Sequence, residues 1–358
     1  MQSKAPIIIE SQGATPVVWQ IRKGVWAGST ICSSLQTEQW FVGGAADVTS
    51  KGKLILVNSG LSAATVDIEV WNEIGAQPAK ALTIKANSYL EVGVDSLAPG
   101  SQSLVIKVFT RAGRVTSYMI DERGRGLRAL GGDLVNFAPK ASKEVFIPAI
   151  PHTVRKVGSK SVELPHTLRI LAPGEIDARI TVSVYSTDGS FIPAGLEGKV
   201  IKSGSVATLD LNPNLPASKF GIRISSDEPI VASIFSQTIS EGKSDFIWST
   251  AAAELTQSNF SVAGLAPQLI FIGAKVKAEL VLLFNNGKRK TVRVNGEDIA
   301  AVRIPDGVRS ISITEAGKGI YGAGLVATKS GYGYFPLTAG SVLTKSSVPM
   351  SNIRVLTP

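Results

Sequence analysis

KLILVNSGLSAATVDIEVWNEIGAQPAKALTIKANSYLEVGVDSLAPGSQSLVIKVFTRAGRVTSYMI, residues Lys53–Ile120, is the stretch that decides the fold class. Short runs of alternating apolar and polar residues are separated by Gly, Pro, Asn and Ser, which is the pattern of half-buried β-strands joined by turns. Val66, Ile68 and Val70 should face one side of a sheet, because side chains alternate along a strand. The sequence therefore predicts an all-β protein.

The same plan returns along the chain, and this internal repetition is the strongest organisational signal. An alternating strand, a turn and a second apolar strand recur at Ile106–Arg123, Ile222–Ile239 and Ile311–Thr328, and a related hairpin is predicted over Ile7–Gln20. We interpret each of the three later copies as a hairpin that closes a unit of about seven strands over roughly 100 residues. That is the size of an immunoglobulin-like sandwich.

The predicted architecture is three tandem immunoglobulin-like β-sandwich repeats plus a terminal hairpin. The predicted division is an amino-terminal hairpin or partial repeat over residues 1–37, sandwiches over residues 38–137, 138–250 and 251–345, and a carboxy-terminal strand over residues 346–358. We expect the two terminal pieces to pair with each other or to cover outer sheet edges, where a bare edge invites aggregation. A β-propeller-like repeat array is the alternative, and it is disfavoured because a blade has four strands.

Composition bounds the class of protein. The chain has 358 residues, of which 44% are hydrophobic and 18% charged, so it can bury substantial cores. Its one cysteine, Cys32, excludes an internal disulfide. No apolar run reaches the roughly 18 residues that span a bilayer, and Met1–Lys4 leads straight into Ile7–Ile9 without a signal-peptide core. We therefore expect either a cytosolic protein or one whose targeting segment lies outside this sequence.

The formal net charge of +9 favours anionic surroundings. Arg123, Arg125 and Arg128 lie in a glycine-rich segment that would let several guanidinium groups converge, so they form the candidate anion-binding patch. Nucleic acid is not expected as a partner, because the basic clusters Arg155–Lys160 and Lys288–Lys290 lack the interleaved aromatic residues that such binding uses.

Aromatic residues offer one alternative site. Tyr332 and Tyr334, separated by glycine, are candidates for stacking on a sugar, which would make the chain an array of carbohydrate-binding modules. Trp71 and Tyr185 end equivalent strands of the first two repeats, and a shared packing role explains that pair more simply.

The sequence shows no catalytic constellation. Gly124–Ala129 matches G-x-G-x-x-A, but Gly131-Gly132 stops any helix behind it, so a dinucleotide site is not expected. His152 and His166 are the only histidines, both beside a proline, and they are too few for a metal site. We expect no catalytic residues, no metal and no cofactor. A hydrolase remains the second alternative, because a Ser-His-Asp triad assembles in space and not in sequence.

Cys32, the run Trp40-Phe41-Val42-Gly43-Gly44 and the strand Leu54-x-Leu56-x-Asn58 carry a family resemblance. The chain resembles an uncharacterised actinobacterial family of secreted or membrane-anchored proteins with tandem β-sandwich repeats, a domain of unknown function. It is also similar to extracellular bacterial repeats of the form L-x-L-x-N-x-G followed by alternating valines and an aromatic residue. This resemblance implies export and brings no catalytic residues.

These observations predict a non-enzymatic extracellular or cell-envelope protein with a structural or interaction role. Function on β-sandwiches is usually carried by the end loops. The expected partners are an anionic cell-wall polymer, lipid headgroups or an envelope protein, and the basic residues named above are where we expect contact.

Overall fold

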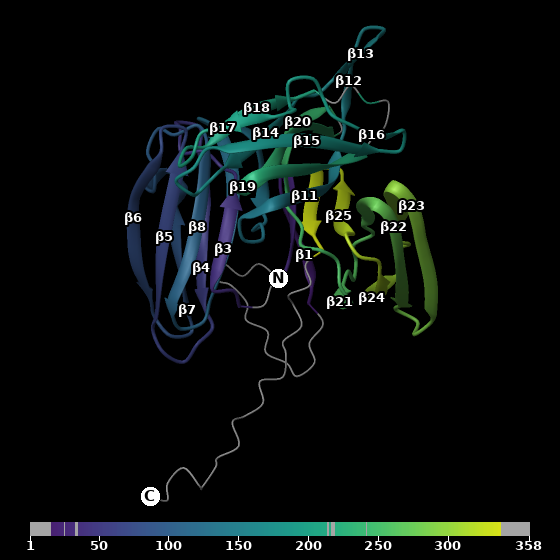
Figure 1. Ribbon diagram of the computed structural model, residues 1–358. Helices are drawn as coiled ribbons and strands as arrows, with labels where there is room; N and C mark the ends of the chain where they lie inside the picture. The colour runs from purple at the N-terminus through teal and green to yellow at the C-terminus, as the bar shows by residue number, and fades with distance from the viewer. Residues whose placement is uncertain are drawn as a thin grey trace, which may run out of the picture.

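The structure is a computed structural model that describes residues 16–24, 26–32, 35–212, 215, 219–240 and 242–337. Those residues form strands and one short 3-10 turn, so the prediction of an all-β fold is confirmed. The described chain contains no helix with the length and apolar character needed to cross a bilayer. The strands group into a terminal hairpin and three units that lie around it (Figure 1).

Unit 1 is a sandwich of two four-stranded antiparallel sheets, with strand orders β10-β9-β4-β7 and β3-β8-β5-β6. Its elements are β3 (Glu38–Val42), β4 (Lys53–Asn58), β5 (Ala64–Asn72), β6 (Ala76–Ile84), β7 (Ser88–Gly93), the 3-10 turn η1 (Val94–Ser96), β8 (Leu104–Ala112), β9 (Val115–Arg125) and β10 (Arg128–Val135). Val66, Ile68 and Val70 are buried between the sheets, as the alternation in their strand predicts.

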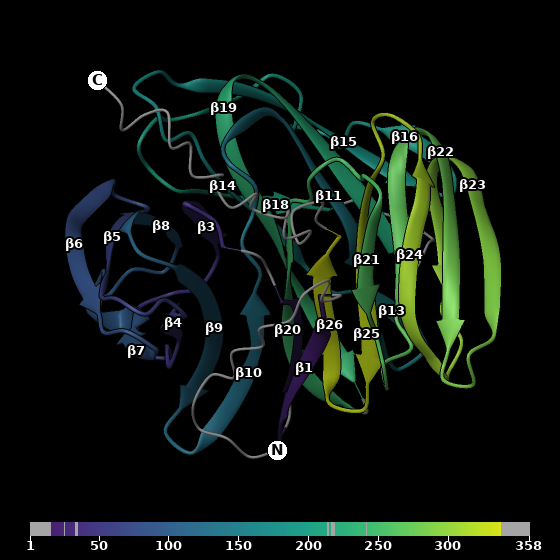
Figure 2. The same ribbon diagram turned by 90° about the horizontal axis from the view of Figure 1, so that it is seen from below.

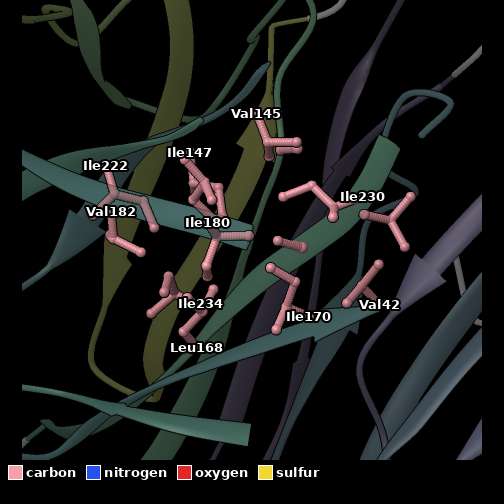
Figure 3. Close-up of a cluster of buried hydrophobic side chains, with 14 of the residues drawn as sticks. Val42, Val145, Ile147, Leu168, Ile170, Ile180, Val182, Ile222, Ile230 and Ile234 are labelled. Atoms are coloured by element: carbon pink, nitrogen blue, oxygen red, sulfur yellow. The ribbon is translucent and has the colours of Figure 1, made fainter. Parts of the chain in front are cut away.

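Unit 2 is built on one very long strand. Its elements are β11 (Ser142–Pro151), β12 (Val154–Val157), β13 (Lys160–Glu163), β14 (His166–Leu171), β15 (Ala178–Ser186), β16 (Gly189–Phe191), β17 (Lys199–Ile201), β18 (Ala207–Leu211), β19 (Lys219–Ser240) and β20 (Lys243–Thr250). The first half of β19 pairs with β11 and β15, and its second half pairs with β14 and β20. The aliphatic core of the unit lies between these two halves (Figure 3).

Unit 3 is a six-stranded sheet made of β21 (Ser258–Ser261), β22 (Gln268–Phe284), β23 (Arg289–Arg303), β24 (Val308–Ala316), β25 (Tyr321–Thr328) and β26 (Gly331–Pro336). One edge of β22 pairs with β23, and the other pairs with β25 near its start and with β24 near its end. The opening strand and the second strand of the predicted repeat are therefore one continuous strand here. Three tandem immunoglobulin-like sandwiches are thus not confirmed.

The predicted closing hairpins are wrong in their pairing. At Ile106–Arg123 the chain reverses, but β8 belongs to one sheet of unit 1 and β9 to the other. At Ile222–Ile239 there is no reversal, because β19 runs straight through Ser225–Pro229. In Ile311–Thr328, β24 and β25 both pair with β22 and not with each other. Turn-forming residues mark a change in the chain, but they do not specify which strand becomes the neighbour.

The terminal hairpin is formed by β1 (Val18–Lys23) and β2 (Trp26–Ile31), which pair antiparallel. The predicted first strand at Ile7–Ile9 and the predicted carboxy-terminal strand over residues 346–358 lie outside the described residues. Every residue of β2 is buried, although β2 pairs only with β1. This burial comes from the other units.

Four sheet-edge strands meet at what we call the strand junction: β2, β10, β20 and β26 (Figure 2). Each pairs with a single described neighbour, and no backbone ladder joins the four within the described chain. Gly331 lies beside Ala27 and Gly333 beside Ser29, Gly132 lies beside Trp26 and Leu134 beside Gly28, and Gly132 bonds Asp245 while Asp133 bonds Trp248. In each pair of strands the contacts advance in the same chain direction. The four strands therefore run parallel, and the turns that precede them lie at one end of the molecule, the hairpin end.

Glycines let these backbones approach closely. A Cβ on Gly132 would lie 2.7 Å from the Trp26 ring, and one on Gly333 would lie 2.0 Å from the Ser29 hydroxyl oxygen. Neither contact could be accommodated without a shift of the backbone or the neighbouring side chain. Gly132 and Gly333 thus serve the junction by leaving space for the neighbouring strand.

We expect Gly333→Ala to lower the free energy of unfolding by about 1–3 kcal/mol, because the added methyl group overpacks the contact with Ser29. Urea unfolding of the full chain measures this loss, and Ser29→Gly in the same chain should recover part of it. Gly174→Ala is the control, since a Cβ there meets nothing within 4 Å. Equal stability of the Gly333 and Gly174 variants would contradict the tight packing.

Candidate functional site

The strand junction is lined with side chains that bond to the backbone of neighbouring units. The Asp245 carboxylate of β20 accepts a hydrogen bond from the Gly132 backbone nitrogen of β10 at 3.0 Å. In return, Asp133 of β10 accepts one from the Trp248 backbone nitrogen of β20 at 2.7 Å. Edge strands leave backbone groups unpaired, and these two carboxylates satisfy the donors that a ladder would otherwise use.

Asn136 and Tyr334 bond to backbone carbonyls in the same way. The Asn136 side-chain amide donates to the Ser29 carbonyl at 3.0 Å and to the Tyr334 carbonyl at 2.8 Å, and the Tyr334 hydroxyl donates to the Thr250 carbonyl at 2.6 Å. Tyr334 is completely buried, and Tyr332 packs partly buried beside it. The predicted pair of sugar-stacking rings is therefore not available on the surface.

Arg123 is also part of the junction, which separates it from the two arginines with which it was grouped. Its guanidinium pairs with buried Asp121 at 2.9 Å and lies 4.9 Å from the centre of the Phe246 ring. The indole nitrogen of Trp248 donates to the same carboxylate at 2.9 Å. Arg123 thus contacts unit 2 through a cation–π contact, while its charge is paired with a carboxylate of its own strand.

Arg169 provides a second buried connection between units 1 and 2. Its guanidinium donates to the carbonyl of Gly44 and lies 4.7 Å from the Trp248 ring centre. Burial, with a smaller contribution from the positive charge of Arg123, lowers the pKa of Arg169 to about 9, so the group remains charged at neutral pH. A charge sealed in this way binds protein carbonyls and does not reach a ligand.

Two junction carboxyl groups have displaced titrations. Burial raises the pKa of Asp133 well above its ordinary value despite the hydrogen bond from Trp248, and the nearby Asp245 adds repulsion. Burial also raises the pKa of Asp245 to about 7 despite the bond from Gly132. The second oxygen of Asp245 has no hydrogen-bond partner among the described residues.

The two histidines meet in space. Nδ1 of His152 and Nε2 of His166 are 3.1 Å apart, Nδ1 of His166 is 2.8 Å from the Ser236 hydroxyl, and Nε2 of His152 is 3.8 Å from Glu163. Phe220 packs edge-on against both rings. His152 lies in the loop after β11 and His166 begins β14, and the hairpin β12–β13 between them returns the chain so that the two rings meet.

The sequence of groups Ser236, His166, His152 and Glu163 resembles a serine–histidine relay, but a substrate has no access to the serine. Ser236 is 0% exposed and His166 is 1% exposed, so the hydroxyl cannot reach a substrate carbonyl. Burial and the adjacent His152 lower the pKa of His166 to about 4. We therefore interpret the cluster as an internal polar connection between β14, β19 and the hairpin β12–β13.

The exposed candidate groups lie at the hairpin end. Arg125 and Arg128 face each other across the turn between β9 and β10 and are exposed. Lys51, from the loop between β3 and β4, reaches over this turn and donates to the Gly126 carbonyl at 3.3 Å. Lys243 is exposed at the start of β20, which runs beside β10. These cations share one end because their strands are parallel.

Two of the three predicted anion-binding arginines thus stay together, and Lys51 and Lys243 join them. Sequence reasoning missed these lysines because their proximity depends on the junction, for which no local signal exists. Within the described residues no group of three His, Cys, Asp or Glu side chains is arranged to hold a metal ion.

Comparisons with known proteins show a family but not an activity. A model described as "Family of unknown function (DUF5719)" matches residues 12–304. No curated protein matches the chain. A solved structure titled "Crystal Structure of Thermotoga maritima 1070" matches with 15% sequence identity and a TM-score of 0.26, covering 31% of this chain and 93% of that one.

We expect Asp245→Asn to change the pH dependence of stability. The folded-state pKa of about 7 lies above the ordinary 3.8, so the wild-type group stabilises the fold at low pH, and this contribution is lost as pH rises through 7. Relative to Asp245→Asn, the wild type should lose about 4 kcal/mol of unfolding free energy between pH 4 and 8. Urea unfolding across this range measures it. The exposed Asp306→Asn control should follow the wild type, and parallel curves for wild type and Asp245→Asn would contradict the assignment.

His166 should act with the opposite sign. Its folded-state pKa of about 4 lies below the ordinary 6.5, so its contribution is present above pH 6.5 and is lost as pH falls towards 4. We expect the wild type to lose about 3 kcal/mol over that interval relative to His166→Gln. Because Asp245 opposes this trend, each variant is compared with wild type at every pH. If the unfolding free energies of His166→Gln and wild type fall equally between pH 6.5 and 4, the buried histidine pair does not cause the loss of stability in acid.

Proposed function

The chain belongs to this family of unknown function, and we propose that it is a non-enzymatic interaction protein of the cell envelope that presents its hairpin end to an anionic partner. The observation that carries the proposal is the collection of Lys51, Arg125, Arg128 and Lys243 at that end. Phosphate-bearing wall polymers and lipid headgroups share the chemistry that such cations recognise. Location in the envelope is inferred from the resemblance to exported repeat proteins.

The distribution of titratable groups supports a binding role over catalysis. Asp133, Asp245, Arg169 and His166 have the perturbed pKa values that often mark active sites. Each of them is buried and bonded to other groups of the protein. Exposed groups at the hairpin end can bind by charge, but they lack the paired acid and base that hydrolysis uses.

The residues on which the two alternative functions depend are buried. Sugar stacking on Tyr332 and Tyr334 needs two accessible rings, and Tyr334 is inside the strand junction. A hydrolase built on His152 and His166 needs an accessible nucleophile, and Ser236 is sealed behind them. Anion binding requires only the exposed cations.

We expect the chain to bind inorganic polyphosphate with an affinity that falls as salt rises, because added ions screen exposed charges. Arg125→Ser with Arg128→Ser should weaken binding on the order of tenfold, since each guanidinium offers charge-assisted hydrogen bonds to phosphate. Isothermal titration calorimetry at several salt concentrations measures both effects.

Lys288→Ser with Arg289→Ser is the matched control. It removes the same charge from the exposed turn that follows β22. The start of β22 pairs with β25 and is the end of the strand nearest the hairpin end, so the turn after β22 lies at its far end. Absence of binding, salt-independent binding, or equal losses in the two double variants would overturn the proposal. Esterase or glycosidase activity that disappears in His166→Ala would overturn the non-enzymatic assignment.

A further inference from the structure

Two large aliphatic side chains lie fully exposed among the cations of the hairpin end. Val48 and Leu127 are 100% and 108% exposed. Leu127 stands at the tip of a two-residue turn in which Gly126 has φ +58°, as the first central residue of a type II′ turn requires. This places an apolar side chain at the outermost point of the hairpin.

Backbone bonds tie the loop that carries Val48 to this hairpin. The Lys51 nitrogen donates to the Glu122 carbonyl at 2.7 Å, and the Gly124 nitrogen donates to the Thr49 carbonyl at 2.8 Å. A Cβ on Gly124 would lie 3.1 Å from the Lys51 Cε atom, so the absence of a side chain there gives room for the lysine stem to cross the hairpin. Val48 and Leu127 are thus held on one tip.

The charge around these aliphatic groups is positive. Neither Arg125 nor Arg128 forms an ion pair with another described residue, and the ammonium group of Lys51 bonds only a carbonyl there. Of the acidic neighbours, Asp47 accepts two hydrogen bonds from Thr49, and Glu122 lies half-buried at the base of the hairpin. Lys51, Arg125 and Arg128 outnumber these two carboxylates, so the tip presents exposed aliphatic groups beside a net positive charge.

We propose that this tip, formed by Val48, Lys51, Arg125, Leu127 and Arg128, docks on the surface of a bilayer that contains anionic phospholipid. Leu127 and Val48 enter the boundary between headgroups and acyl chains, while the three cations remain at the level of the phosphates. This inference deepens the proposed function by naming the anionic partner.

The aliphatic groups distinguish a bilayer from an anionic polymer. A soluble polymer would neutralise the cations but would leave Leu127 in water, so it gains nothing from that residue. A bilayer removes both aliphatic side chains from water and also binds the cations, and burial of one leucine side chain is enough for about a tenfold change in affinity. Lys243 on the neighbouring parallel hairpin extends the basic surface beside the tip.

The test is co-flotation of the full chain with vesicles of phosphatidylglycerol and phosphatidylcholine, with pure phosphatidylcholine vesicles as the neutral reference. We expect binding only to the anionic vesicles. Leu127→Ser should weaken it on the order of tenfold and Leu127→Phe should strengthen it, while neither changes the affinity for inorganic polyphosphate. Arg125→Ser with Arg128→Ser should weaken binding to both probes.

Leu61→Ser is the matched control, because Leu61 is 89% exposed in the loop at the opposite end of β4 and should not affect binding. Vesicle binding that is unchanged in Leu127→Ser, or reduced equally in Leu61→Ser, would overturn the bilayer contact. Binding to polyphosphate without binding to vesicles would also overturn it, while leaving the proposed function intact. Failure to bind either probe would overturn both.

Discussion

The rest of the structure depends on how four sheet edges meet without a ladder. β2, β10, β20 and β26 each need partners for the backbone groups that they turn towards one another. A continuous sheet would supply them by strand pairing, but these strands belong to different units and come together by packing. Side chains therefore take the place of the ladder, with carboxylates accepting from backbone nitrogens and an amide and a phenol donating to carbonyls. Each buried polar group left unpaired would cost about 1–3 kcal/mol.

This constraint also determines where exposed chemistry lies. Because the four strands run parallel, the turns before them emerge at one end, although they are far apart in sequence. Arg123 and Arg169 lie at the contact between units 1 and 2, where Arg123 packs on Phe246 and Arg169 donates to the Gly44 carbonyl. Arg125, only two residues from Arg123, lies beyond the last buried position and remains free for a partner. The division between arginines bonded within the protein and arginines exposed to solvent thus follows from the length of the β9–β10 hairpin.

Sequence reasoning predicted what depends on local periodicity. The alternation of Val66, Ile68 and Val70 gave the strand and its buried face correctly. The pairing of strands across turns was not predictable in this way. The residues of the turn between β8 and β9 suit a hairpin and equally suit a crossing to the other sheet, so they do not indicate which strand becomes the neighbour. The burial of Tyr334 and the meeting of the two histidines were not predictable for a related reason. Their surroundings include residues 70 or more positions away, such as Thr250 and Ser236.

The junction also explains why the units differ from one another. A carboxylate on one edge must meet a backbone nitrogen on the next, and Asp245 has room for this because its neighbours at that level are Gly131 and Gly331. Burial is the main cause of the raised pKa of Asp133, and repulsion from the nearby Asp245 adds to it, so carboxylates brought closer together would repel more strongly. Edges that pack on each other must therefore be complementary and not identical. A chain built from repeats can close around such a junction only when its edge strands diverge, while the strands within each unit keep the shared alternation.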